Sequence, residues 1–326
     1  VFASGPLAGA IRYLGPVSRD LAFGLVRALS AGCLMQTVGV TGASSQLGVF
    51  LLPQLLAAGY RVDAFSRKVS SASEMESGRL RWSKTVSDGR LDALISCGPL
   101  SLAETLVRES GRIERVVAFS TSSVAAKADS PNRSEEQQMK AIRSDEDRLI
   151  SACRERGIGL LLLRPTLIYG CGLDRNISLL ARFGRRFGFI PMAGEAPGLR
   201  QPVHAQDLAA LAVNALSAEQ APDLVSAACG GSTLTYREMV IEIAGCLDRV
   251  RPISIPAAIL RIAAALASAV PAYRGINAEM VRRQAVDLVF DDSLLRTGLD
   301  YKPRAFRLSP EDFDIPPECR RLQLGR

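Results

Sequence analysis

The sequence predicts an α/β fold in which a doubly wound parallel sheet carries a smaller, mostly helical C-terminal lobe. Short apolar runs alternate with helical patterns over residues 35–230, as in sheets whose parallel strands are joined by crossover helices. A glycine-containing turn at residues 41–48 separates the first apolar run from the first helical pattern. With 326 residues, of which 48% are hydrophobic, the chain has ample material for the core of such a fold.

Hydrophobic periodicity places the elements in order. After the run that ends at residue 41, strands are expected at residues 60–65, 91–96, 115–119, 160–163 and 224–228. Helices are expected at residues 47–58, 134–156, 177–187, 206–216, 235–248, 256–270 and 277–287. The alternation becomes looser after residue 170, so the second lobe is expected to combine an insertion there with the last third of the chain.

The helix at residues 134–156 is the longest of these. Ser134 followed by Gln137 has the pattern of a capping box at its start, and Gly157 marks its end. Its apolar face is formed by Met139, Ile142, Leu149 and Cys153.

The turn at residues 41–48 has the features of a dinucleotide pyrophosphate site. Backbone N–H groups at a helix N-terminus favour anionic oxygens, and glycines let the backbone approach them. Ser45 is small enough to permit the same approach and offers a hydroxyl to a phosphate. The cofactor contacts expected from this turn are Gly42, Ser44, Ser45, Gln46, Leu47 and Gly48. The alternative is a plain turn between strand and helix that binds nothing.

The composition of the chain limits the kinds of ligand and partner that it is expected to bind. The net charge is +7, but the basic residues are spread out, and the densest cluster is Arg182, Arg185 and Arg186. Without a basic stripe or a recognition motif, nucleic acid is not expected, and a phosphorylated small molecule explains the charge. Seven cysteines without a C-x-x-C pair favour a reducing, cytoplasmic compartment, and the single histidine disfavours a metal site. No apolar run reaches the ~18 residues that a spanning helix requires.

Five motifs along the chain resemble one enzyme family when they are taken in order. They are Thr41–Gly48 (TGASSQLG), Phe119–Val124 (FSTSSV), Arg164–Gly170 (RPTLIYG), Gln201–Ala209 (QPVHAQDLA) and Thr297–Pro303 (TGLDYKP). They are similar to motifs of the extended short-chain dehydrogenases/reductases, the branch that includes nucleotide-sugar epimerases, dehydratases and reductases. This resemblance implies a Rossmann domain, a nicotinamide cofactor and a nucleotide sugar or similar anionic metabolite as substrate.

The resemblance fails at the catalytic pair of that family, Tyr-x-x-x-Lys. Aligning the helix at residues 134–156 with the family puts Met139 at the tyrosine and Arg143 at the lysine. No tyrosine in the whole chain has a lysine four residues later. Because a thioether cannot exchange a proton, the chain is identified as an atypical member of the family.

The residues after the second strand indicate the type of cofactor. Sites for NAD(H) place a carboxylate there for the ribose hydroxyls, whereas this chain has Ser66, Arg67 and Lys68. A cationic pair suits a 2′-phosphate, so NADP(H) is preferred and NAD(H) is the second choice. The other interpretation is a solvated basic turn. Ser96 and Cys97 end the next strand, where the family lines the adenine and ribose side, although a simple loop is an equally good interpretation.

The family pattern also indicates residues near the reaction centre. Thr121 matches the catalytic hydroxyl of the family, and Ser120 beside it would contact the cofactor; a hydroxyl at a strand end often only caps the backbone. Lys127 lies close enough in sequence to replace the missing lysine, or is a solvated side chain. Arg143 would bind a ribose or phosphate oxygen, and Pro165 would shape the nicotinamide loop.

Arg200, Gln201 and His204 are the residues expected at the substrate. The second lobe of the family binds a nucleotide diphosphate with arginines, and Arg200 and Gln201 lie in the corresponding segment. His204 is either a general base or a structural residue of its loop.

These observations give a domain plan and two rival functions. Residues 1–34 are a leader or a mis-assigned start, residues 35–230 form the NAD(P)-binding Rossmann domain, and residues 231–326 form the substrate lobe, with 172–200 contributing. The first function is redox or epimerase/dehydratase chemistry, with a homodimer as one arrangement. The second is a non-catalytic NADP(H)-binding structural subunit or redox sensor.

Overall fold

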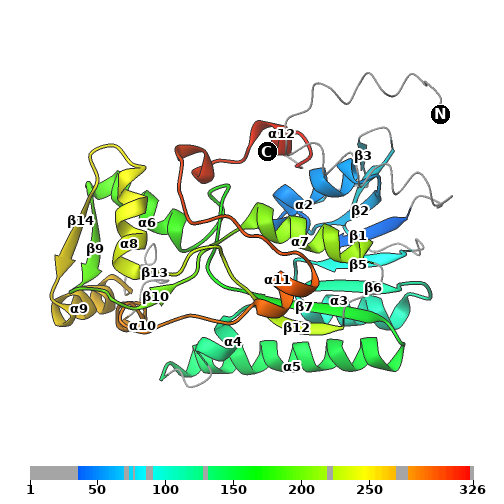
Figure 1. The fold of residues 1–326 in the computed structure, drawn as a ribbon, viewed down its shortest axis with the longest axis horizontal. Coiled ribbons are helices and arrows are strands. Elements are labelled where there is room, and N and C mark those ends of the chain that lie inside the picture. The colour runs from blue at the N-terminus through cyan, green and yellow to red at the C-terminus, as the bar shows by residue number, and fades with distance from the viewer. Residues whose placement is uncertain are drawn as a thin grey trace, which may run out of the picture.

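The fold has two parts, a sheet with helices on both faces and a second lobe around α6, α8, α9 and β14 (Figure 1). The computed structural model describes residues 36–69, 73–75, 78–85, 91–127, 131–218, 223–268 and 278–323. The expectation for residues 1–34 therefore lies outside the described residues.

Eight strands form the central sheet, in the order β12-β7-β6-β5-β1-β2-β4-β3. All neighbours pair in parallel except β3, which lies antiparallel to β4 at the edge. The order reverses between β1 and β5, which makes that point the topological switch of a doubly wound sheet. The strands are β1 (Thr37–Thr41), β2 (Arg61–Phe65), β3 (Ser73–Met75), β4 (Leu80–Ser83), β5 (Ala93–Ser96), β6 (Arg115–Phe119), β7 (Gly159–Pro165) and β12 (Leu224–Ala228).

The helices cover both faces of this sheet, as the apolar runs require. On one face α2 (Gln46–Ala57) packs against α7 (Ala205–Ser217), and on the other α3 (Leu100–Glu109) packs against α5 (Arg133–Glu155). Each layer closes its own buried apolar cluster against the strands. The predicted doubly wound parallel sheet is therefore confirmed.

The long helix α5 begins earlier than its sequence pattern predicts. Asn132 is its N-cap, and the Asn132 carboxamide oxygen accepts the N–H groups of Ser134 at 3.0 Å and Glu135 at 3.3 Å. The predicted capping box of Ser134 and Gln137 is wrong, because both residues lie inside the helix. An asparagine two residues upstream supplies the same capping interaction at an earlier position.

The second lobe is built around a parallel pair of strands, β9 (Phe189–Ala193) and β14 (Arg251–Ile255). Its buried cluster includes Ile177, Ile190 and Ile243. Two short strand pairs connect this lobe to the sheet, β8 (Ile168–Tyr169) with β11 (Val203–His204) and β10 (Leu199–Arg200) with β13 (Leu234–Thr235). Its helices are α6 (Ile177–Phe187), α8 (Tyr236–Gly245), α9 (Ala257–Ser268) and α10 (Ala278–Arg283). None of the helices in the described part of the chain is long and apolar enough to cross a membrane.

The C-terminal segment returns to the first domain, so packing divides the chain differently from the predicted boundary at residue 231. Leu295, Tyr301 and Leu322 belong to the apolar cluster of β1, α2 and α7. The indole N–H of the buried Trp82 in β4 donates to the carbonyl oxygen of Leu322 at 3.2 Å. The elements of this segment are α11 (Ser293–Gly298), the 3₁₀ turn η3 (Pro310–Phe313) and α12 (Pro317–Arg320).

A buried ion pair fixes α5 to the carboxyl ends of β6 and β7. The Glu146 carboxylate, which is fully buried, accepts hydrogen bonds from both Nε and Nη2 of Arg164. The Ser120 hydroxyl donates to the same carboxylate. The pair raises the pKa of Arg164 above its usual value. Sequence reasoning missed this network, although Glu146 stands on the apolar face of the helix, where a carboxylate requires a cationic partner.

Breaking this pair on one side should destabilise the protein. Arg164→Met leaves the Glu146 carboxylate buried without its cation, so we expect the free energy of unfolding to fall by about 3 kcal/mol. The double variant Arg164→Met with Glu146→Met removes both charges and should recover most of that loss. Urea denaturation of the two variants provides the measurement. Equal loss in the single and double variants would show that packing, rather than the unpaired charge, dominates.

Candidate functional site

Two glycines in the turn between β1 and α2 are required by the backbone that surrounds them. Gly42 has φ +63°, and a Cβ there would lie 2.5 Å from the carbonyl oxygen of Cys97. A Cβ on Gly48 would lie 2.0 Å from the carbonyl oxygen of Ala43. Ser45 is the N-cap of α2, and its hydroxyl accepts the N–H of Gly48 at 3.3 Å. A serine is therefore accommodated at position 45, between the two glycines, as a helix cap.

The first turn of α2 follows directly on the turn after β1. Among the described residues, the N–H groups of Gln46 and Leu47 have no protein acceptor, as expected in the first turn of a helix. The carboxamide of Gln46 donates to the carbonyl oxygen of Gly170 at 3.0 Å, which links this turn to β8. The arrangement can hold an anion such as a pyrophosphate.

The end of β2 lies beside the glycine turn. The hydroxyls of Ser44 and Ser66 are 3.0 Å apart, and the N–H of Lys68 donates to the Ser66 hydroxyl at 3.3 Å. The side chains of Arg67 and Lys68 are exposed at this end of the strand. Two cations thus lie one strand away from the glycine turn.

Ser96 and Cys97 lie at the end of β5, on the other side of the topological switch point from β1. The buried Thr41 hydroxyl donates to the Ser96 hydroxyl at 3.0 Å, and the N–H of Cys97 donates to the carbonyl oxygen of Thr41 at 2.9 Å. Burial raises the pKa of the Cys97 thiol to about 12, so this thiol stays protonated at neutral pH. Both residues hold β1 and β5 together at the point where a dinucleotide would cross them.

A cavity of about 980 Å³ lies between the carboxyl ends of β6 and β7 and the second lobe. Apolar residues of α6, α9 and α10 form much of its wall. The sequence-predicted residues that line it are Gln46, Ser120, Thr121, Lys127, Pro165, Arg200 and Gln201. Residues from distant segments of the chain are therefore brought to one site.

Thr121 and Lys127 both lie at the cavity wall, and both have protein partners. The Thr121 Oγ1 accepts the N–H of Ser123 at 3.1 Å, so its hydroxyl hydrogen is left for another acceptor. The Nζ of Lys127 lies 3.5 Å from the Glu135 carboxylate, which also accepts from Arg283 at 2.9 Å. Sequence reasoning missed Glu135 and Arg283, because their pairing joins α5 to α10 across 148 residues of chain.

Arg200 and Gln201 are buried and bound to backbone. The guanidinium of Arg200 donates to the carbonyl oxygens of Leu199, Arg283 and Val286, and burial lowers its pKa. The Gln201 carboxamide oxygen accepts the N–H of Phe290 at 2.8 Å. These bonds fix residues 283–290 as part of the cavity wall.

The three arginines of α6 do not all face the cavity. Arg182 and Arg186 line the cavity together with Arg175 from the preceding loop. Arg185 instead stacks over the ring of Phe313, with the guanidinium carbon 5.1 Å from the ring centre. The cavity therefore has cationic side chains suited to an anionic ligand.

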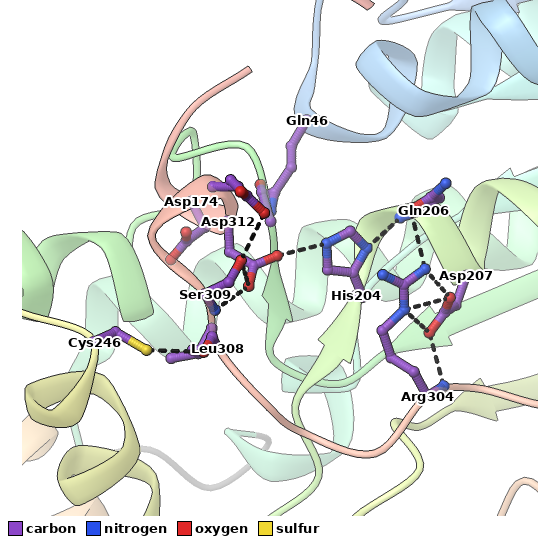
Figure 2. Close-up of polar contacts among 12 residues, drawn as sticks. Gln46, Asp174, His204, Gln206, Asp207, Cys246, Arg304, Leu308, Ser309 and Asp312 are labelled. Carbon is purple, nitrogen blue, oxygen red and sulfur yellow. Dashed lines mark hydrogen bonds and ion pairs between the residues drawn. The ribbon is translucent and has the colours of Figure 1, made fainter. Parts of the chain in front are cut away.

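Three further residues lie away from the cavity lining. Arg143 is exposed on α5, and Met139 is buried on the same helix. His204 is buried, and Figure 2 shows its Nε2 facing Asp312 at 3.2 Å and its Nδ1 accepting the N–H of Gln206 at 3.0 Å. The imidazole thus caps α7 and bonds the C-terminal segment with both of its nitrogens.

Metal-binding clusters are not found in the described residues. No group of three or more His, Cys, Asp and Glu side chains there could hold a metal ion. The six described cysteines are all free thiols.

Comparison with known sequences gives a single short match. No protein-family model matches the chain. A stretch of 104 residues is 26% identical to the UDP-glucose 4-epimerase of Vibrio cholerae, and it covers 32% of this chain and 32% of that enzyme. The chain thus spans about a third of the length of this curated relative.

Several solved structures superpose on most of the chain. An epimerase, Mth375, from Methanothermobacter thermautotrophicus superposes with a TM-score of 0.61 at 16% identity, covering 86% of this chain and 90% of that one. MoeE5 in complex with UDP-glucuronic acid and NAD gives 0.61 at 18% identity, covering 87% and 99%. The dTDP-glucose 4,6-dehydratase DesIV of Streptomyces venezuelae, with NAD and TYD bound, gives 0.57 at 17% identity, covering 83% and 93%. The chain shares the Rossmann-like α/β fold of these three structures.

The pairing of His204 with Asp312 predicts a dependence of stability on pH. Burial opposes ionisation of Asp312, but hydrogen bonds from His204 and from the N–H of Ser309 outweigh it and hold its pKa below the usual value. The stabilisation is therefore present above the unfolded pKa of about 3.9 and is lost as the pH falls through the lower folded pKa. We expect Asp312→Asn to cost about 1 kcal/mol at neutral pH and less below about pH 4.

Thermal unfolding from neutral to acidic pH checks this expectation. The exposed Asp314, two residues later in the same segment, provides the matched control Asp314→Asn. A difference between wild type and Asp312→Asn that stays constant through the acid range would contradict it.

Proposed function

We propose that the chain binds a nicotinamide dinucleotide across the switch point between β1 and β5 and a nucleotide sugar or similar anionic metabolite in the adjoining cavity. The proposed reaction class is redox or epimerase/dehydratase chemistry. The observation that carries the proposal is the first turn of α2 after Gly42, whose first two N–H groups find no acceptor among the described residues, beside a cavity lined by Thr121 and Lys127. The three solved structures described above, two of them with NAD bound, share this fold and support the proposal.

The cofactor we propose is NADP(H), with NAD(H) as the weaker ligand. The pyrophosphate would lie against the N–H groups of Gln46 and Leu47. From there the adenosine ribose would extend toward β2, where Ser66 is linked to the glycine turn and Arg67 and Lys68 are exposed. Two cations at that end suit a 2′-phosphate better than two free hydroxyls.

The substrate would be held by the cations of the cavity. Arg175, Arg182 and Arg186 line the wall on the α6 side and would bind the phosphates of a nucleotide sugar. The apolar side chains of α9 and α10 on the other wall exclude water from the site. A bound nicotinamide would accept and return a hydride there.

Proton exchange would fall to Thr121, Lys127 and Glu135. Because the Thr121 oxygen already accepts the Ser123 N–H, its hydrogen is free to bond a substrate oxygen. Lys127 and Glu135 form a pair 3.5 Å apart that can pass a proton to or from the same region. Lys127 would thus take the part of the missing lysine of the resembled family.

A second function, binding of NADP(H) without catalysis, is favoured by one specific observation. The helix α5 contains no tyrosine, and Met139, which the alignment places at that position, is buried outside the cavity lining. A structural subunit or redox sensor needs only the binding half of the site. Both functions require cofactor binding, but only the first requires turnover of a substrate.

The cofactor preference is tested at Arg67. Arg67→Asp places a carboxylate where a 2′-phosphate would lie, and we expect the Kd for NADPH to rise by ~10-fold or more while NADH binds as well as before or better. The matched control is Arg61→Asp, which makes the same charge change at the exposed, opposite end of β2. Titration of each variant with both cofactors gives the answer. An unchanged NADPH affinity in Arg67→Asp would remove the basis for the preference.

Turnover is tested at Thr121 and Lys127. With cofactor-loaded protein and a panel of nucleotide sugars, we follow reduced-nicotinamide absorbance and separate the products chromatographically. Thr121→Val should lower kcat by about 10² or more, and Lys127→Met should lower it comparably. Thr105→Val, an exposed hydroxyl on α3, is the control for a general effect of losing a threonine. Saturable NADPH binding without turnover of any substrate would instead establish the non-catalytic function.

A further inference from the structure

The helix α9 of the second lobe exposes an unusually apolar face. Ile259, Ile262 and Leu266 are 58%, 63% and 69% exposed. Their spacing of three and four residues puts them on one side of the helix. Ile253 of the neighbouring strand β14 is 43% exposed and adds to the same end of the molecule, where Figure 1 shows β14 beside α9.

Another side of α9 is already occupied. Ala264 is buried, and Leu260, Ala263 and Ala264 line the cavity. The helix therefore lines the cavity with one side and exposes Ile259, Ile262 and Leu266 on another. This face takes no part in the site proposed above.

The charged residues of the chain segment that carries the apolar face are all basic. Residues 249–268 contain three arginines, Arg249, Arg251 and Arg261, and no aspartate or glutamate; Asp248 stands just before them. All three arginines are exposed. An exposed apolar stripe with basic residues at its flanks matches a surface that is both apolar and anionic, as the interface of a bilayer with acidic phospholipids is.

Other occupants fit this face less well. Two copies meeting through the same face would gather the arginines of both copies at one interface, because a two-fold interface pairs a surface patch with itself. A strand from a partner would have to pair with the open edge of β14, where Pro252 lacks an N–H donor. The helix has 12 residues, shorter than the roughly 20 that a membrane span requires, so it would lie in the plane of the interface.

We propose that α9 and β14 dock the protein on an anionic phospholipid bilayer. The side chains of Ile259, Ile262 and Leu266 enter the boundary between headgroups and acyl chains, and the three arginines bind lipid phosphates. This inference is independent of whether the cavity turns over a nucleotide sugar.

Vesicle co-sedimentation of the full chain tests the proposal. Vesicles of phosphatidylcholine with phosphatidylglycerol should bind the protein saturably, and pure phosphatidylcholine should bind it at least ~5-fold more weakly. Ile262→Glu with Leu266→Glu should weaken binding to the anionic vesicles by ~10-fold or more. The matched control is Leu294→Glu on α11, since Leu294 is 60% exposed but lies beside β12 on the first domain.

A tryptophan reporter shows whether α9 itself enters the lipid. The only native tryptophan, Trp82, is fully buried, so Ile262→Trp adds an exposed probe. Its emission should shift to the blue and be quenched by brominated lipid when anionic vesicles are added.

Three results would overturn the proposal. The first is no sedimentation with either vesicle, and the second is an equal loss in the α9 double variant and Leu294→Glu. The third is a concentration-dependent dimer that the α9 variant abolishes, which would assign the face to a second copy. Far-UV circular dichroism and thermal unfolding of each variant verify that the fold is retained.

Discussion

The contact between the backbones of Gly42 and Cys97 is the constraint on which the site depends. At this point β1 and β5 are neighbours, and the chain leaves them in opposite directions. A left-handed turn directly against a carbonyl group admits only glycine there, and that turn aims the first amides of α2 across the switch point. The bond between Ser44 and Ser66 then holds the end of β2 at the same opening. One steric requirement therefore places every element of the proposed pyrophosphate and ribose site.

A second constraint joins the two walls of the cavity. The Tyr301 hydroxyl donates to the carbonyl oxygen of Cys229, Phe306 and Phe313 enter the core of the second lobe, and Leu322 returns to Trp82 in β4. The segment therefore contacts the first domain, the lobe and the first domain again. The bond between His204 and Asp312 lies on this path, which makes the histidine part of the connection between the domains (Figure 2).

Periodicity was enough to predict the parallel core of the sheet, because most of its strands are short apolar runs between clear helical patterns. The strands at 115–119 and 224–228 match the observed β6 and β12. The strand β4 escaped prediction, since LRWS is too short and too mixed to show a period, and its Trp82 is buried by the distant C-terminal segment.

The site was predictable only where a motif is local in sequence. The glycine turn is such a motif. The pairs Glu146–Arg164 and Glu135–Arg283 are not, because each joins residues that only the tertiary fold brings together. Neither the role of Glu135 nor the backbone contacts of Arg200 could be inferred from neighbouring residues.

The geometry of α5 bears directly on the missing tyrosine. Residues four apart lie on the same face of a helix, so Glu135 stands one turn before Met139. Of the two, only Glu135 lines the cavity, and its carboxylate is held by both Lys127 and Arg283. In the proposed site, the group on α5 that exchanges a proton would therefore lie one helical turn nearer the N-terminus than the aligned tyrosine position, and it would be a carboxyl group paired with an ammonium in place of a phenol. The proposed proton exchange rests on a charged pair that lines the same cavity as Thr121, which is why the variants of Thr121 and Lys127 distinguish an enzyme from a binding protein.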